Sequence, residues 1–371
     1  MQATELSSLT AQVLLASFAF SFLFGAIAQR THFCTMGAVS DIVNMGDWQR
    51  MRQWALAAGV AMLGFGALVL LGKVDPSKTL YAGSRVLWLS ALVGGALFGF
   101  GMVLASGCGS KTLVRIGGGS LKSLIVFIVM GVAAFATLKG MPAMLRVATV
   151  DQATMNSVAL SAVSTASSNL FGIKIQLAQM LAAALIGGSL SLWAMSSKDS
   201  RSSSNLLAGF GIGGVITAMW WASGSLGFVA EHPDSLQEVF LATNSGRSEA
   251  LSFVAPVAYV VDWFMFFSDK SKVITLGIAS VFGVIAGSAV MALFTKSFRW
   301  EGFGSTEDVG NHLVGAVLMG VGGVTAMGCT VGQGLSGIST LSTMSFIAVA
   351  AIIGGAVLAL KYQMWRMERM A

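Results

Sequence analysis

Three cysteines, the only ones in a chain of 371 residues, follow apolar stretches that resemble one another. Residues 92–108 (LVGGALFGFGMVLASGC) and 313–329 (LVGAVLMGVGGVTAMGC) are identical at ten of seventeen positions, and both copies end on Gly-Cys. A third apolar, glycine-containing stretch ends on its own cysteine. Self-similarity of this kind indicates a structural repeat. A thiol where each apolar helix stops predicts a pathway through Cys34, Cys108 and Cys329.

The chemistry of the thiol leaves three functions open. Soft thiols bind Cu(I), but no cluster of His and Met at ligand spacing accompanies the cysteines. A sulfur-transfer nucleophile that forms a persulfide needs a neighbouring base or cation, and only Cys34, with Arg30 and His32, has one nearby in sequence. Neutral thiols are weak, polarizable hydrogen-bond donors that suit a sulfur-containing anion. The third function, a path for such an anion, is the one we favour.

The segments after the cysteines are rich in Gly, Ser and Thr, and they favour an anion path. Backbone N–H groups in such turns form anion-binding concavities. Irregular backbone is tolerated at membrane depth only where it is buried in protein or lines a cavity, so these segments are candidate re-entrant loops. Gln333 either donates to the substrate or satisfies the backbone. The expected path residues are Cys34, Cys108, Cys329, Arg30, Gly107, Gly109, Ser110, Lys111, Arg115, Gly328, Thr330, Gly332 and Gln333.

Other polar residues carry weaker signals. Asp41 either caps a helix or pairs with Arg30, and we expect the cap. Asp262 lies in a short apolar segment, and acids inside membranes are costly and often functional. His32, His232 and His312 lie at segment edges or in a loop and are expected to face water. No P-loop, dinucleotide fingerprint or metalloprotease motif is present, and we expect no cofactor and no bound metal.

The composition indicates an integral membrane protein. Only 10% of the residues are charged and 55% are hydrophobic, and the chain has 45 glycines against four prolines. Soluble domains carry about a quarter charged residues, whereas small residues let membrane helices approach closely. The net charge of +6 is expected to reflect topology, with no nucleic acid as partner. The first ten residues lack a positive cluster, so no signal peptide is expected. An odd number of cysteines without a C-x-x-C pair argues against a disulfide framework or structural zinc.

Nine segments are long and apolar enough to cross a bilayer, so we predict an all-α integral membrane protein with about nine transmembrane helices and short re-entrant helices. A tenth segment, 251–267, is predicted to lie at the interface. With nine spans, one face carries thirteen basic and seven acidic residues and the other nine of each, which favours an outside N-terminus and a cytoplasmic C-terminus. The predicted spans are 11–29, 52–72, 86–106, 121–138, 175–195, 206–224, 273–294, 310–328 and 342–361.

The span count also predicts how the repeats are arranged. Each half has four spans, and a single connecting span lies between the halves. Equivalent points of the two halves are therefore separated by five spans, an odd number, so the second half inserts inverted relative to the first. This arrangement is common in transporters. The halves are predicted as residues 1–174 and 206–371, joined by a connecting helix and loop over 175–205. A fourth glycine-rich element, 209–224, has Trp220, Trp221 and Ser223 in place of a cysteine, so the symmetry is broken at one corner.

The cysteine elements together resemble the YeeE/YedE family of membrane proteins, whose characterised members take up thiosulfate. The resemblance rests on QRTHFC at 29–34, FGMVLASGCGSKTLVRIGGG at 100–119 and MGVGGVTAMGCTVGQGL at 319–335. It implies two pseudo-symmetric halves in an hourglass-like body, with thiosulfate relayed by hydrogen bonds to Cys34, Cys108 and Cys329. It also implies a bacterial inner membrane location and a small cytoplasmic sulfur acceptor of the rhodanese or TusA type.

Two departures from the family pattern change the charge near the path. Lys111 stands where the family usually has glycine, and Val39-Ser40-Asp41 lacks the arginine expected before the aspartate. They leave a related sulfur or selenium compound open as substrate. Import of a dianion against a negative-inside potential costs roughly 2.3 kcal/mol per charge per 100 mV, so it needs a coupling ion or consumption inside. The sequence has no clear proton relay, and consumption is the expectation.

Overall fold

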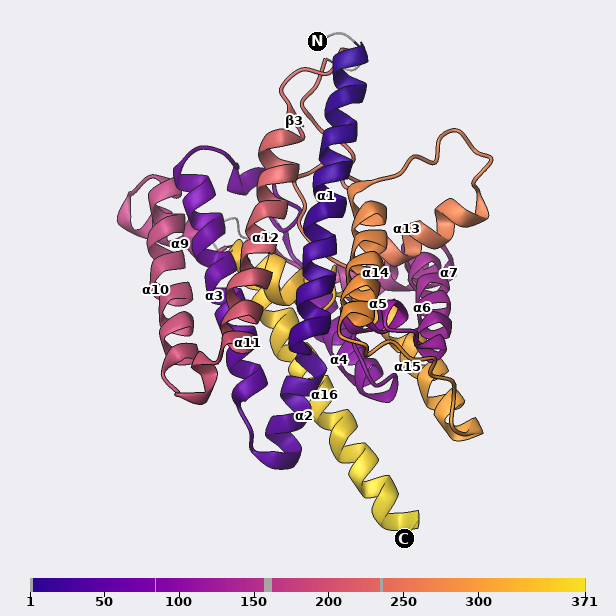
Figure 1. Cartoon of the computed structure of the whole chain (residues 1–371). Coiled ribbons are helices and arrows are strands. Elements are labelled where there is room, and N and C mark those ends of the chain that lie inside the picture. Colours follow the sequence, from indigo (N-terminus) through magenta and orange to yellow (C-terminus); the bar gives the residue numbers. More distant parts are fainter. Residues whose placement is uncertain (1–2, 84, 157–161, 234–235, 371) are drawn as a thin grey trace.

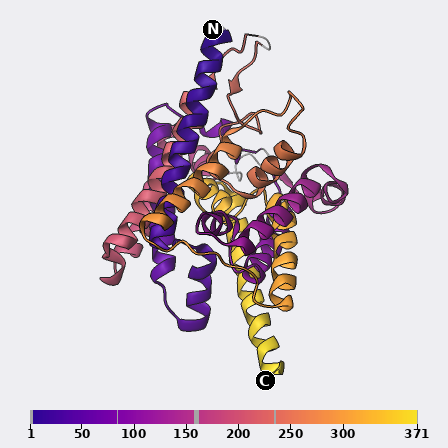
Figure 2. The ribbon, with the colours of Figure 1, turned by 45° about the vertical axis from the view of Figure 1, so that its right-hand side comes forward.

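The protein is an almost entirely helical bundle. The computed structural model describes residues 3–83, 85–156, 162–233 and 236–370. The chain begins at one end of the bundle and α16 finishes at the opposite end (Figure 1, Figure 2). The longer helices are α1 (Ala3–Thr31), α2 (Thr35–Met45), α3 (Gln49–Leu70), α4 (Trp88–Leu104), α5 (Gly109–Gly117), α6 (Leu121–Lys139), α7 (Met141–Ala148), α9 (Val163–Phe171), α10 (Ile175–Met195), α12 (Ile212–Trp221), α13 (Val254–Met265), α14 (Leu276–Phe294), α15 (Thr306–Thr325) and α16 (Thr343–Met370).

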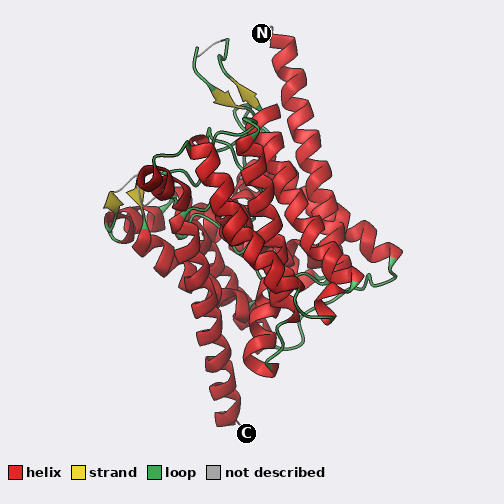
Figure 3. Ribbon diagram, turned by 90° about the vertical axis from the view of Figure 1, so that its left-hand side faces the viewer, coloured by secondary structure: helices red, strands yellow, loops and turns green. Residues whose placement is uncertain are grey.

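Short elements complete the description. The described residues contain two small two-stranded sheets, as Figure 3 shows, and both are antiparallel. Residues 203–226 form one continuous helix in which α12 lies between two π-helical turns. The remaining elements are β1 (Arg85–Val86) with β2 (Met155–Asn156), β3 (Phe228–Val229) with β4 (Val239–Phe240), η1 (Pro76–Lys78), η2 (Val150–Gln152), η3 (Asp199–Arg201), α11 (Ser203–Leu206), η4 (Leu207–Gly211), η5 (Ala222–Leu226) and η6 (Gly332–Gly337).

Eight helices of the described chain are long and apolar enough to cross a membrane, and the chain is a multi-pass membrane protein. They correspond to eight of the nine predicted spans. The ninth, 310–328, forms α15, a helix of 20 residues whose first turn carries Glu307 and Asp308 and which is not among the eight. The predicted interfacial segment forms α13, whose 12 residues are fewer than the roughly 20 that a bilayer needs. Asp262 on α13 pairs with Lys272, with Nζ and Oδ2 2.6 Å apart.

The two duplicated glycine-rich helices pack directly against each other. A Cβ atom on Gly94 would lie 2.7 Å from the Gly322 carbonyl oxygen, and one on Gly101 would lie 2.7 Å from that of Gly315. Along α4 from Gly94 to Gly101, the facing residue in α15 moves back from Gly322 to Gly315. The two copies therefore run antiparallel. Only glycine allows two backbones to approach this closely.

Further close approaches tie the outer helices to this central pair. The other face of α4 packs on α16, where a Cβ on Gly99 would overlap the Ile352 carbonyl oxygen. On α15, a Cβ on Gly320 would lie 2.6 Å from the Met130 carbonyl oxygen of α6. Elsewhere α1 packs on α14, and α3 packs on α12 and α10. Helices from the predicted first half thus pack mainly on helices from the second.

The glycine contacts yield a stability prediction. Gly99→Ala places a methyl group on the Ile352 carbonyl oxygen, and overpacking of this kind costs about 1–3 kcal/mol. The matched control is Gly354→Ala, because a Cβ at this exposed helical position meets nothing within 4 Å. Thermal unfolding of the detergent-solubilised protein is expected to shift down for Gly99→Ala and to be unchanged or shift up for Gly354→Ala. Equal unfolding temperatures would contradict the close packing.

Candidate functional site: three cysteine helix breaks

Each cysteine follows the same strained helix break. Two positions before it stands a non-glycine residue in the left-handed region: His32 with φ 54°, Ser106 with φ 55° and Met327 with φ 55°. This conformation costs a residue with a Cβ atom of order 1 kcal/mol and clusters at functional sites. Repetition of the strained turn at all three cysteines confirms that they occupy equivalent breaks, as the sequence spacing predicted.

The sulfur atoms cap the elements that follow. Cys34 is the N-cap of α2, and its Sγ accepts the Gly37 N–H at 3.3 Å. At Cys329 the Sγ accepts the Gly332 N–H at 3.4 Å, again three residues on. A thiol that accepts through its sulfur keeps its own S–H hydrogen for another acceptor. Both thiols therefore keep an S–H that the cap does not use, next to the positive end of a helical turn.

The third thiol, Cys108, is a neighbour of both of the others. Cys108 is the N-cap of α5, and its Sγ lies 3.3 Å from the Ser110 hydroxyl. It interacts electrostatically with both Cys34 and Cys329. Cys108 and Cys329 are buried, whereas Cys34 is partly exposed. Because α4 and α15 are antiparallel, Cys108 and Cys329 reach the centre from opposite ends of the bundle. Cys108 is thus the neighbour that the partly exposed Cys34 and the buried Cys329 share, and we call the three thiols in this order the row.

Two cations surround the exposed end of the row. Arg50 of α3 and Lys111 of α5 both act electrostatically on Cys34. Arg50 also forms an ion pair with Asp41, with Nε and Oδ2 3.2 Å apart, and a Cβ on Gly37 would lie 2.6 Å from its guanidinium. The prediction for Asp41 was wrong, because this residue neither caps a helix nor pairs with Arg30. The arginine that the family pattern has before this aspartate is absent here, and Arg50 of α3 places a cation beside Asp41 instead.

The other predicted cations lie near the same end but play different parts. Arg30 is exposed in the last turn of α1. Arg115 donates to the Ser106 carbonyl oxygen at 3.2 Å and so braces the strained turn before Cys108. The side chain of Lys111 packs over Gly107, where a Cβ would lie 3.2 Å from its Cγ. Of these, only Lys111 is an electrostatic neighbour of Cys34.

The polar residues at the buried Cys329 end are mostly engaged within the fold. Gln333 donates from Nε2 to the Ala326 carbonyl oxygen at 2.6 Å and accepts from Ser345 at 2.6 Å, which favours the backbone-satisfying interpretation. The Gly332 carbonyl oxygen accepts from the Tyr81 hydroxyl at 2.6 Å. In contrast, the Thr330 hydroxyl is buried with no hydrogen-bond partner among the described residues. Thr330 is therefore available to a passing ligand.

The remaining predicted glycines differ in how tightly they are packed. Gly109 has ordinary space, because a Cβ there would meet nothing closer than 3.6 Å. A Cβ on Gly328 would lie 3.1 Å from the Gln333 Cγ, and one on Gly332 would lie 2.6 Å from the Ser252 hydroxyl. Gly332 therefore brings the loop before α13 against the Cys329 break. The turn that it opens, η6, is π-helical, a form that often marks functional sites.

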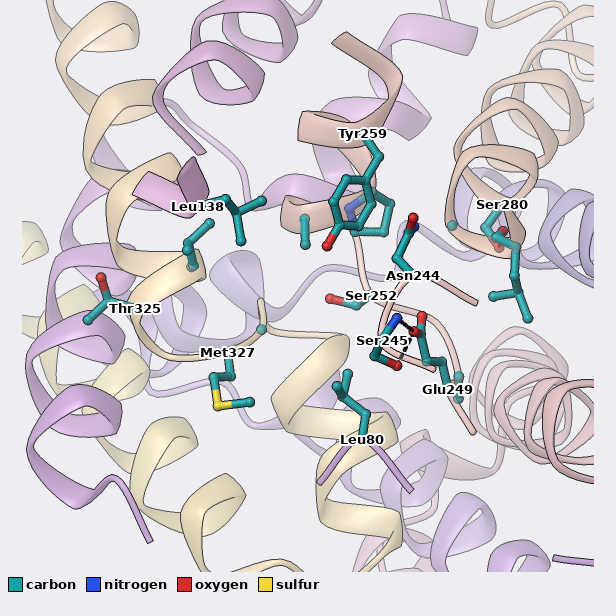
Figure 4. Close-up of a pocket in the computed structure, with 18 of the residues that line it drawn as sticks. Leu80, Leu138, Asn244, Ser245, Glu249, Ser252, Tyr259, Ser280, Thr325 and Met327 are labelled. Carbon is teal, nitrogen blue, oxygen red and sulfur yellow. Dashed lines mark hydrogen bonds between the residues drawn. The ribbon is translucent and has the colours of Figure 1, made fainter. Parts of the chain in front are cut away.

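A cavity of about 400 Å³ opens beside the Cys329 break. Met327 and Gly328 of the break line it, together with the 244–256 loop and α13 (Figure 4). Its wall is mostly apolar, with polar groups on one side that include Ser252, Tyr259 and Glu249. The sequence analysis missed this cavity because its lining combines loop residues with the ends of helices that lie far apart in the sequence. The row of thiols thus has a cavity near its buried end and cations at its exposed end.

The histidines take no part in a metal site. Within the described residues, no group of three or more His, Cys, Asp and Glu is placed to hold a metal ion. His32 is exposed, as predicted. For His312 the prediction was wrong, because this residue is buried and its Nδ1 lies 2.9 Å from the Asp308 carboxylate.

Comparison with known proteins agrees with this geometry. A family model described as Sulphur transport matches residues 30–358. The chain belongs to the Sulphur transport family. This confirms the resemblance to YeeE/YedE proteins. Family members are transporters, and the chain is not expected to be an enzyme.

Curated relatives match over most of the chain. The thiosulfate transporter TsuA of Escherichia coli strain K12 is 25% identical over 342 residues, covering 90% of each chain. TsuA of Spirochaeta thermophila is 26% identical over 341 residues, covering 90% of this chain and 94% of its own. The probable transporter YedE of Escherichia coli strain K12 is 34% identical over 92 residues, covering 25% of this chain and 21% of its own.

Arg50 provides a test of the exposed end of the row. Arg50→Gln removes a cation beside Cys34, and a charge interaction across a few ångströms of water is worth about 1 kcal/mol. We expect uptake of a sulfur oxyanion into proteoliposomes to fall by about fivefold. Arg52→Gln is the control, because Arg52 lies two residues away but contacts Trp193 instead. Equal uptake by the two variants would show that Arg50 does not contribute to the path.

Proposed function

We propose that this protein is a bacterial inner-membrane permease that imports thiosulfate, passing it along the row of Cys34, Cys108 and Cys329. The observation that carries the proposal is the repeated strained break, which leaves a thiol at a helical N-terminus three times in one row. The similarity to TsuA proteins named as thiosulfate transporters, over 90% of the chain, supports the substrate.

The chemistry of thiosulfate matches what the breaks offer. The ion is a dianion with a soft terminal sulfur and harder oxygens. A neutral S–H is a weak donor that binds such a sulfur without holding it tightly, whereas a thiolate would repel the dianion. The N–H groups of the following helical turn add partial positive charge at each stop. Several weak binding sites of similar affinity favour transport, because the anion must bind at each site loosely enough to move on to the next.

The direction follows from the proposed topology. With the N-terminus outside, the cavity beside Cys329 faces the periplasm and the Cys34 end faces the cytoplasm. The antiparallel packing of α4 on α15 supports inverted halves over 1–174 and 206–371, with 175–205 as connector. The anion then passes Cys329 first, Cys108 next and Cys34 last.

Consumption inside completes the transport cycle. A small cytoplasmic sulfur acceptor of the rhodanese or TusA type that takes thiosulfate at the Cys34 end removes the product and makes uptake directional. Arg50 and Lys111 beside Cys34 draw the anion toward this end. Consumption offsets the electrical cost of importing negative charge against a negative-inside potential.

Replacement of the cysteines tests the proposal. Single Cys→Ala variants at 34, 108 and 329 each lose one donor, and a hydrogen bond to a charged group is worth about 1.5–3 kcal/mol. We expect thiosulfate-dependent growth of an uptake-deficient bacterium to fail or slow strongly for each alanine variant. Cys→Ser variants keep a donor and are expected to retain partial growth.

Ser189→Ala is the matched control, because Ser189 lies exposed on α10 and bonds only to its own helix. Normal growth of all three alanine variants would contradict the proposal that the thiols relay thiosulfate. Mass spectrometry of the wild-type protein after incubation with thiosulfate separates the relay from sulfur transfer. The relay predicts unmodified thiols, and a persulfide formed during transport would contradict it.

A further inference from the structure

Two acidic side chains line the cavity beside Cys329, and Glu249 is the one that is not paired with Arg146. Glu249 lies in the loop before α13, and its carboxyl group forms part of the cavity wall (Figure 4). The same cavity reaches Met327 and Gly328 of the Cys329 break. An anion approaching Cys329 from this side therefore passes a carboxyl group. A carboxylate repels a dianion, so its protonation state controls whether the cavity accepts one.

The loop holds this carboxyl group in a defined position. The Glu249 Oε1 accepts the Ser245 N–H at 2.9 Å and also the Ser245 hydroxyl. Both of these bonds end on Oε1, and the Asn244 backbone N–H adds a third hydrogen bond to the carboxyl group. The backbone is held as well, because the Glu249 N–H donates to the Ser223 hydroxyl at 3.1 Å. Ser223 belongs to the fourth glycine-rich element, so the corner without a cysteine positions a carboxyl group.

No cation in the described part of the chain forms an ion pair with Glu249. Arg247 is two residues away, but its guanidinium donates to the Thr79 and Ala82 carbonyl oxygens. Arg146 lines the same cavity and is paired with Asp151 at 3.0 Å.

The other titratable groups near Glu249 are phenols. Tyr259 of α13 and Tyr81 of the loop after η1 are its electrostatic neighbours. Neither carries a positive charge to stabilise a carboxylate. Burial raises the pKa of Glu249, against the smaller opposing effects of the hydrogen bonds from Ser245 and from the Asn244 backbone. The surroundings therefore favour the protonated carboxyl group more than water does.

We propose that Glu249 binds a proton together with thiosulfate in the cavity, so that uptake is proton-linked. The inference rests on the proposed transport function and adds a proton site to it. Protonation removes the negative charge that repels the dianion, and a protonated carboxyl group donates a hydrogen bond as well as accepting one. One proton per dianion also halves the net charge that enters with the substrate, which lessens the demand on consumption inside.

Linkage fixes the sign of the pH dependence. The bound dianion favours the protonated form of Glu249, so binding takes up a proton and, reciprocally, the proton strengthens binding. As the pH rises through the pKa of Glu249 in the unliganded protein, the carboxylate forms and thiosulfate binding weakens. Above that pKa the dissociation constant is expected to rise by up to about tenfold per pH unit.

Calorimetry on the purified full-length protein tests the proposal. Thiosulfate is titrated at one pH in buffers with different ionisation enthalpies, which gives the number of protons taken up per ion bound. The wild-type protein is expected to take up protons on binding. Glu249→Gln keeps an amide oxygen for Ser245 but has no titrating group, so it is expected to bind thiosulfate with proton uptake lost and with affinity that no longer depends on pH.

The control is Glu231→Gln, which alters an exposed acid of the β3–β4 hairpin and is expected to behave as wild type. Wild-type binding without proton uptake, or unchanged proton uptake in Glu249→Gln, would overturn the proton site while leaving transport intact. The wild-type measurement decides the matter even where the variant fails to fold. Absence of both thiosulfate binding and thiosulfate flux in the wild-type protein would instead overturn the transport function, and the proton site with it.

Discussion

Close approach of the α4 and α15 backbones is the constraint on which the central part of this protein depends. Glycines at the crossing let two antiparallel helices touch without side chains between them. The two helices end soon after this contact, α4 at Leu104 and α15 at Thr325. The chain turns away through a residue in the left-handed region, and a cysteine follows two positions later. Packing and chemistry are therefore joined at each break.

The breaks convert an apolar core into a sequence of weak donors. Cys108 and Cys329 belong to the same buried cluster as Phe24, Phe98 and Phe253. In such surroundings a serine would carry a stronger desolvation cost than a thiol, which is at home among apolar groups. The capping bonds from Gly37 and Gly332 fix two of the sulfurs and leave their hydrogens free. Charged residues stay at the ends of the row, with Arg50 and Lys111 beside Cys34.

The sequence predicted the parts of this arrangement that repeat. Duplication located the cysteine breaks, and hydropathy located the helices, because both signals lie within one continuous segment. Contacts between distant segments left no such signal. Arg50 was counted only as a topological charge, although it pairs with Asp41 from the next helix. The cavity and Glu249 were missed because that wall combines loop residues with the ends of helices that lie far apart in the sequence. His312 was assigned to water from its place at a segment edge, yet the fold buries it against Asp308.

Protection of the thiols by substrate tests the central claim, that all three cysteines face one path, most directly. Vesicles carrying the wild-type protein are treated with a membrane-permeant maleimide, with and without thiosulfate, and alkylation of each cysteine is followed by peptide mass spectrometry. The relay predicts that thiosulfate slows alkylation at Cys34, Cys108 and Cys329 alike, whereas sulfate at equal ionic strength has little effect. Unchanged alkylation of Cys108 and Cys329 in vesicles that still transport thiosulfate would contradict the account.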